Sequence, residues 1–131
     1  MILLTGVTGK TGGEVACQLS AAGVPFRAMV RNPARVAALA HLGATEIVVG
    51  DVADDAALTS ALEGIDRALL VMPNGEHQLL LENRFTYRAQ RAGVRHLVKL
   101  SSLESVPESP NPITRMHVAS EEFIRESGMD W

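Results

Sequence analysis

Short apolar runs alternate with longer amphipathic segments along the whole chain. Two of these runs, at 47–49 and 68–72, are apolar without interruption, as is typical of parallel strands that are covered on both faces. The segments between the runs have the apolar spacing of helices that pack on a sheet. The expected strands are 2–5, 26–30, 46–49, 67–72 and 96–100, and the expected helices are 12–22, 33–42, 55–62, 77–92 and 113–127.

This alternation predicts an α/β fold, a doubly wound parallel sheet of five strands in the order 3-2-1-4-5, flanked by helices. Helix boundaries agree with it, because glycine follows four of the expected helices and Asn32-Pro33 has the form of a helix start. Helical spacing also predicts buried side chains, namely Val15, Leu19, Ala22, Leu58, Ala61, Leu62, Leu81, Phe85, Ala89, Ala92, Phe123 and Ile124.

The junction between the first strand and the first helix carries Gly6, Gly9 and Gly12 at every third residue. Glycine permits a tight turn there and lets the backbone approach a phosphate closely. The N–H groups that begin a helix are unpaired and lie at the positive end of its dipole, which suits a pyrophosphate. The junction therefore predicts a dinucleotide-binding Rossmann fold, with Thr8, Lys10 and Thr11 among the cofactor-binding residues.

Two other interpretations of this junction are weaker. Gly9-Lys10-Thr11 resembles the end of a phosphate-binding P-loop, but that motif needs a glycine where the chain has Leu4. A glycine turn without any ligand is the second alternative. The dinucleotide interpretation is favoured because it accounts for all three glycines and for the strand–helix–strand unit around them.

The end of the second strand distinguishes NAD from NADP. An NAD site places an acid roughly 20 residues beyond the glycine loop, but the chain has Arg31 and Asn32 there, and no acid lies between Glu14 and Glu46. The guanidinium of Arg31 matches the 2′-phosphate of NADP, so NADP (NADPH) is the expected cofactor. A solvated charge at a strand end is the alternative for Arg31.

Composition narrows the class of protein. The chain has 131 residues, 47% of them hydrophobic, and a net charge of −3, which argues for one folded domain and against disorder or direct nucleic-acid binding. No apolar run approaches the roughly 20 residues of a membrane span. With one cysteine, Cys17, and no signal peptide, the expected location is the cytoplasm. No cluster has metal-ligand spacing. The oligomeric state stays open, a homo-oligomer included.

Five segments occur in order, with the sequences TGVTGKTGG at 5–13, MVRNP at 29–33, GDVAD at 50–54, AGVRHLVKLSS at 92–102 and HVASEEFIRESGMDW at 117–131. Together they resemble the atypical short-chain dehydrogenases of the NmrA-like and quinone-oxidoreductase-like group. The resemblance implies an NAD(P)-binding Rossmann domain over 1–131. It further implies that Asp51 and Val52 lie beside the adenine, that Met72, Pro73 and Asn74 lie near the ribose and nicotinamide, and that Ser101 and Ser102 approach the nicotinamide.

The chain also departs from that pattern. The broader superfamily moves a proton with a tyrosine that lies four residues before a lysine, and those places look like His117 and Glu121 here. His117 is a candidate acid or base because histidine ordinarily titrates near neutrality, and Ser102 is a weaker candidate. A histidine on a helix surface is the alternative. Lys99, inside an otherwise buried strand, has no role that the sequence explains.

The resemblance also implies a sixth strand and a substrate-binding part after Trp131. We therefore expect either a fragment of a longer protein or a shortened member that keeps the cofactor-binding half, and the sequence does not choose between them. We expect an NADP-dependent oxidoreductase, or its cofactor-binding domain, that moves hydride between the nicotinamide and a small-molecule quinone, enone or carbonyl. A quinone tolerates the missing tyrosine best, because its reduced oxygens take protons from weak donors. The alternative is an NmrA-like redox sensor that binds NADP without catalysis.

Overall fold

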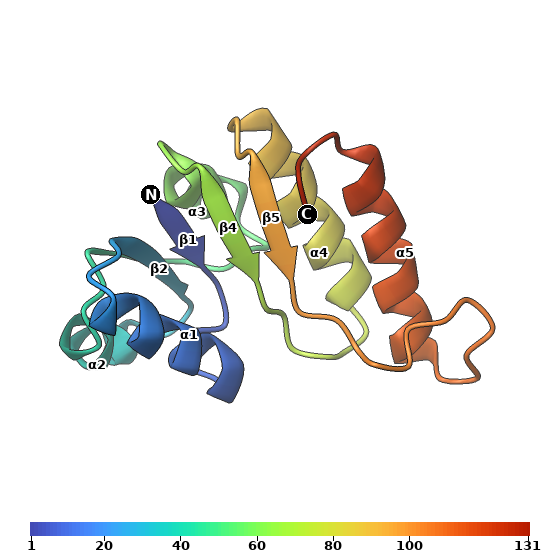
Figure 1. Ribbon diagram of the computed structural model, residues 1–131, viewed down its shortest axis with the longest axis horizontal. Helices are drawn as coiled ribbons and strands as arrows, with labels where there is room; N and C mark the ends of the chain where they lie inside the picture. The colour runs from blue at the N-terminus through green and yellow to red at the C-terminus, as the bar shows by residue number, and fades with distance from the viewer.

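Five short parallel strands form the centre of the computed structural model, which describes residues 1–131. They are β1 (Ile2–Leu4), β2 (Phe26–Val30), β3 (Glu46–Val49), β4 (Arg67–Leu70) and β5 (His96–Lys99). Their order, β3-β2-β1-β4-β5, confirms the predicted fold (Figure 1). Because every neighbouring pair is parallel, the carboxyl ends of all five strands lie at one edge of the sheet.

Helices cover both faces of this sheet (Figure 1). Helices α1 (Lys10–Ala21) and α2 (Val36–His41) lie on one face, and α3 (Asp55–Leu62), α4 (Gln78–Arg91) and α5 (Pro112–Glu126) lie on the other. Successive residues of a strand point to opposite faces, so Leu3 packs in the core under α3, α4 and α5 while Leu4 packs in the core under α1 and α2. None of the helices has the length and apolar character to span a membrane.

A few boundaries differ from the prediction. The expected helix over 33–42 divides into a 3₁₀ turn (Pro33–Arg35) and α2, because Asn32 accepts hydrogen bonds from Ala34 N through its side chain and from Arg35 N through its carbonyl. Ala22 and Ala92 are exposed, so their predicted burial is wrong. Each is the last residue before a glycine with positive φ, where the chain turns away from the helix.

One face of the sheet is only partly covered. Beside α1, strands β4 and β5 have no helix over them (Figure 1), and Val98 is half exposed. The result is a mainly apolar groove, lined by Ile2, Leu4, Val15, Leu19, Arg67, Ala68, Leu69, His96 and Val98.

The last residues of the chain lie alongside β5. Asp130 forms a parallel bridge with His96, in which Asp130 N donates to Arg95 O and Leu97 N donates to Asp130 O, both at 2.8 Å. The strand-like pairing therefore begins one residue before Trp131.

Arg27 connects β2 to the end of α3. Its Nη1 donates to the carbonyls of Ala61 at 2.8 Å and Glu63 at 2.7 Å, and its Nε donates to Glu46 on β3 at 2.6 Å. The Arg27 side chain is only 13% exposed. The last carbonyls of a helix lack partners within it and lie at its negative end, so the guanidinium both satisfies and neutralises them.

Arg27→Met should therefore lower the free energy of unfolding by about 2 kcal/mol, because it removes a charged donor from several carbonyls. Urea denaturation followed by circular dichroism measures the change. Glu46→Gln is the matched control: it neutralises the half-exposed partner of the Arg27 ion pair, leaves the bonds from Arg27 to the helix carbonyls in place and should cost less than about 1 kcal/mol. Equal effects of the two substitutions would contradict the role of Arg27 at the helix end.

Candidate functional site

A pocket opens at the carboxyl ends of β1, β2, β3 and β4. Seven residues predicted to bind the cofactor line it, and they are Gly6, Thr8, Arg31, Asp51, Val52, Met72 and Pro73. The other lining residues, which were not predicted, are Thr5, Val7, Met29, Val30, Gly50, Val71 and Leu81. All of these except Leu81, which comes from α4, lie within two residues of a predicted residue in the sequence. The positions of the strand ends are therefore the signal that could have identified them.

The glycine turn between β1 and α1 forms one wall of this pocket. Gly6 has a φ of +64°, and a Cβ on it would lie 2.8 Å from the Val71 carbonyl oxygen. A Cβ on Gly12 would collide with the Gly6 carbonyl. Gly9 has more room, since its Cβ would approach only the Gly6 oxygen, at 3.3 Å. Gly6 and Gly12 therefore permit the turn and the close packing of α1, and Gly9 keeps the turn free of side chains.

The first turn of α1 is an open set of hydrogen-bond donors. Gly9 caps the helix without a side chain, and no acidic residue lies in its first turn. The backbone N–H groups of Lys10, Thr11 and Gly12 have no acceptor. Such amides bind anionic groups well, so this cradle fits the pyrophosphate of a dinucleotide. Lys10 and Thr11 are exposed, and with Gly9 and Gly12 they lie outside the lining of the pocket.

Arg31 lies at the rim of the pocket and makes few contacts there. Its side chain is 72% exposed, and its one ion pair joins Nε to Asp51 Oδ2 at 4.0 Å. The other carboxylate oxygen of Asp51 accepts a hydrogen bond from Ala53 N at 2.8 Å. The Arg31 guanidinium is thus free to turn towards another anion, which is what the predicted contact with a 2′-phosphate requires.

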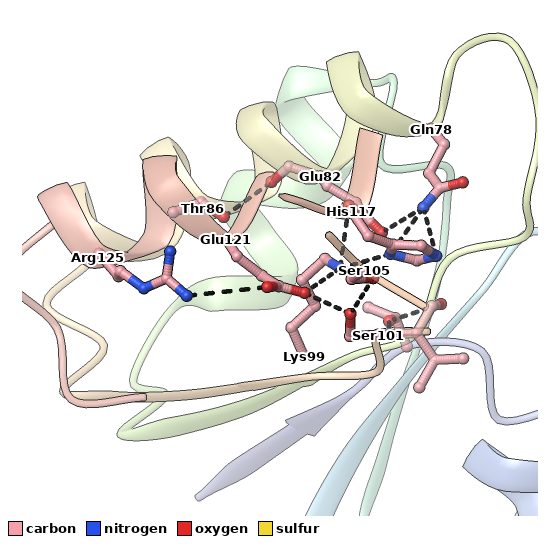
Figure 2. A network of polar contacts seen from close by, with 11 residues as sticks. Gln78, Glu82, Thr86, Lys99, Ser101, Ser105, His117, Glu121 and Arg125 are labelled. Atoms are coloured by element: carbon pink, nitrogen blue, oxygen red, sulfur yellow. Dashed lines mark hydrogen bonds and ion pairs between the residues drawn. The ribbon is translucent and has the colours of Figure 1, made fainter. Parts of the chain in front are cut away.

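A second group of polar residues lies between β5, α4 and α5 (Figure 2). Lys99 is at its centre, with a side chain only 4% exposed. Its Nζ lies 2.7 Å from His117 Nδ1, 3.6 Å from Glu82 Oε2 and 3.9 Å from Glu121 Oε1. The carboxylates of the two helices compensate the buried charge, and this accounts for the lysine that the sequence left unexplained.

The predicted catalytic residues differ in their surroundings. His117 is buried, so it is not the surface histidine that was the alternative. Its pKa lies below the ordinary value because burial and the positive charge of Lys99 disfavour the imidazolium, while the carboxylates of Glu82 and Glu121 oppose this effect in part. Ser102 is half buried, and its Oγ accepts a 3.4 Å hydrogen bond from Glu104 N, outside the polar group.

Two further predicted residues can be placed. Ser101 donates to Glu121 Oε1 and shares a 3.1 Å hydrogen bond with Ser105, so it adjoins the polar group (Figure 2). Asn74 is exposed and does not line the pocket. Sequence reasoning missed Gln78 and Glu82, although polar residues four apart on the inward face of an amphipathic helix are a signal that was available.

Comparisons with known proteins agree with this geometry. The profile of the NAD(P)H-binding family matches residues 6–131. The chain is 34% identical to the NAD(P)H azoreductase of Xenophilus azovorans and 35% identical to quinone oxidoreductase 2 of Escherichia coli, over 100% and 98% of its length. It is also 40% identical, over its whole length, to a (4-alkanoyl-5-oxo-2,5-dihydrofuran-3-yl)methyl phosphate reductase of Streptomyces griseus.

Solved structures show the same relationship. The NADPH complex of the Escherichia coli quinone oxidoreductase superposes with a TM-score of 0.84 at 32% identity, over 98% of this chain and 46% of that one. Triphenylmethane reductase of Citrobacter, complexed with NADP(H), gives a TM-score of 0.82 at 29% identity.

The chain spans a little under half the length of the curated relatives named above. Its match to the family covers nearly all of its own residues, and the glycine cradle and the parallel sheet are those that the family's cofactor needs. The chain therefore belongs to the NAD(P)H-binding family and, within it, to the atypical short-chain dehydrogenases of the NmrA-like and quinone-oxidoreductase-like group.

Proposed function

We propose that the chain is the NADPH-binding part of a reductase that transfers hydride to a quinone, with enones and carbonyl compounds as further acceptors. The observation that carries the proposal is the position of Arg31 at the rim of the pocket beside the glycine turn. Its guanidinium is exposed and has only a long ion pair with Asp51. No carboxylate follows β2 directly to bind the ribose hydroxyls of NAD. A phosphate at the ribose 2′ position is the group that Arg31 fits.

The proposed roles follow the order of the strand ends. The amides at the start of α1 and the glycine turn hold the pyrophosphate, and Arg31 holds the 2′-phosphate. Asp51 and Val52 border the adenine. Met72, Pro73, Asn74 and Ser101 are assigned to the nicotinamide half. When bound, NADPH supplies the hydride through its reduced nicotinamide.

A quinone is the favoured acceptor for two reasons. The chain is similar to a protein named quinone oxidoreductase. It also has no tyrosine near the polar group, since Tyr87 is exposed on α4. The oxygens of a reduced quinone need only a modest proton donor, and His117 is the residue that we assign to that role.

Arg31→Ala should weaken NADPH binding about 10- to 100-fold, because a charge-assisted hydrogen bond to the phosphate is lost. NADH binding should change little, since NADH carries no 2′-phosphate. Calorimetric titration of the chain with each nucleotide measures both. Arg91→Ala, at the exposed end of α4 and outside the pocket, is the matched control. An equal loss for NADPH and NADH would refute the assignment of Arg31.

The chain should oxidise NADPH when a panel of benzoquinones and naphthoquinones is supplied, as followed by NADPH absorbance. His117→Gln should lower kcat by about 10²-fold or more, without weakening NADPH binding, because it removes a proton donor. His41→Gln, on exposed α2, should leave the rate unchanged. Tight NADPH binding without turnover of any acceptor would favour either the redox sensor or a cofactor-binding part that needs the substrate-binding part of its relatives for turnover.

A further inference from the structure

In the contact between Lys99 and His117, one atom is the donor and the other is the acceptor. We propose that Lys99 is a positioning residue that fixes the protonation of His117, holding the imidazole neutral with its lone pair on Nδ1 and its proton on Nε2. The inference rests on the proposed function only in taking His117 as a proton donor.

Lys99 and His117 are in direct contact. Lys99 Nζ and His117 Nδ1 are 2.7 Å apart, which is a short hydrogen bond. An ammonium group has donors and no lone pair, so a charged Lys99 requires the lone pair on Nδ1. A neutral histidine then carries its proton on Nε2.

Lys99 keeps its charge. The carboxylates of Glu82 on α4 and Glu121 on α5 face its ammonium at 3.6 and 3.9 Å, and both favour the charged form. A lysine side chain ordinarily holds its proton about four pH units above histidine. Lys99 therefore faces Nδ1 as the donor of their hydrogen bond.

His117 stays neutral. An imidazolium would place a second positive charge 2.7 Å from the ammonium, at a site where both residues are almost fully buried. Burial and the Lys99 charge accordingly hold the pKa of His117 below its ordinary value, although Glu82 and Glu121 act in the opposite direction.

The Nε2 side of the ring is the free side. The amide nitrogen of Gln78 lies 3.1 Å from both ring nitrogens, so it lies over the face of the ring and not in line with an Nε2–H bond. No carboxylate or carbonyl oxygen accepts a hydrogen bond from Nε2. We therefore assign the Nε2 proton, which has no acceptor within the protein, to the transfer.

This arrangement gives a balanced proton transfer. The Nε2–H bond breaks as an O–H bond forms on the anionic oxygen of the reduced quinone, and a proton moves from the Lys99 ammonium to Nδ1. The imidazole stays neutral as the other tautomer, and Lys99 becomes an amine that solvent reprotonates. Without the ammonium, the same transfer would leave an imidazolate, which is far too basic to form readily.

The test is the state of His117 in the free chain, with neither NADPH nor quinone present. Long-range ¹H–¹⁵N correlation of histidine side chains distinguishes the two neutral tautomers from the imidazolium, and loss of signals in His117→Gln assigns the residue. We expect His117 to be the Nε2–H tautomer at neutral pH. An Nδ1–H tautomer or an imidazolium at neutral pH would overturn the proposal without any Lys99 variant.

Lys99 variants test the cause. Lys99→Met should abolish the single tautomer and raise the pH at which His117 gains a proton by about one unit or more, a tenfold change in proton affinity. Lys99→Arg keeps a cationic donor and should retain the Nε2–H tautomer. Lys10→Met removes the only other lysine, at the start of α1 on the opposite face of the sheet from α5, and should leave the His117 spectrum unchanged.

If the tautomer and its pH dependence are the same in Lys99→Met as in the native chain, Lys99 does not fix the state of His117 and the proposal fails. Because the spectra need no cofactor or acceptor, this failure is distinguishable from a failure of quinone turnover. The expected tautomer in a chain without quinone turnover would count against catalysis by this chain alone and leave the role of Lys99 intact.

Discussion

The close approach of Gly12 to the Gly6 carbonyl is the constraint on which the carboxyl edge of the sheet depends. A side chain on either glycine would collide with backbone, Gly12 with Gly6 and Gly6 with Val71. Their absence lets a short turn join β1 to α1, so that the unpaired amides of α1 lie at the carboxyl edge of the sheet. Van der Waals contact between two backbones thus determines where an anion can bind.

The pairing of β4 with β5 links the nucleotide pocket to the buried polar group. Leu70 is paired with Lys99, so Val71 and Met72, which line the pocket, follow β4 at the level where the lysine ends β5. The register of β4 against β5 therefore sets the position of the pocket residues relative to Lys99. A buried ion pair such as Lys99–Glu82 adds little stability on balance, and its value here lies in the charge that it places against His117.

The fold and most of the pocket were predictable because their signals are local. Alternating strands and helices leave few topologies, and Gly6, Arg31 and Asp51 each lie next to a strand end that the sequence marks. The polar group was not predictable in the same way. Lys99 stood out as a charge in a buried strand, but its partners come from two helices, and the bond between Gln78 and His117 spans 39 residues. The strand repeat of two residues and the helix repeat of 3.6 residues relate only neighbours within one element, so neither predicts a contact between residues of different elements.

The apolar groove over β4 and β5 has a consequence for handling the protein. Fluorescent dyes that report unfolding do so by entering exposed apolar surface, and the native sheet already presents such surface around Val98 and Leu69. Dye fluorescence should thus be high before any heating, so a melting curve recorded with such a dye would mix binding to the folded chain with true denaturation.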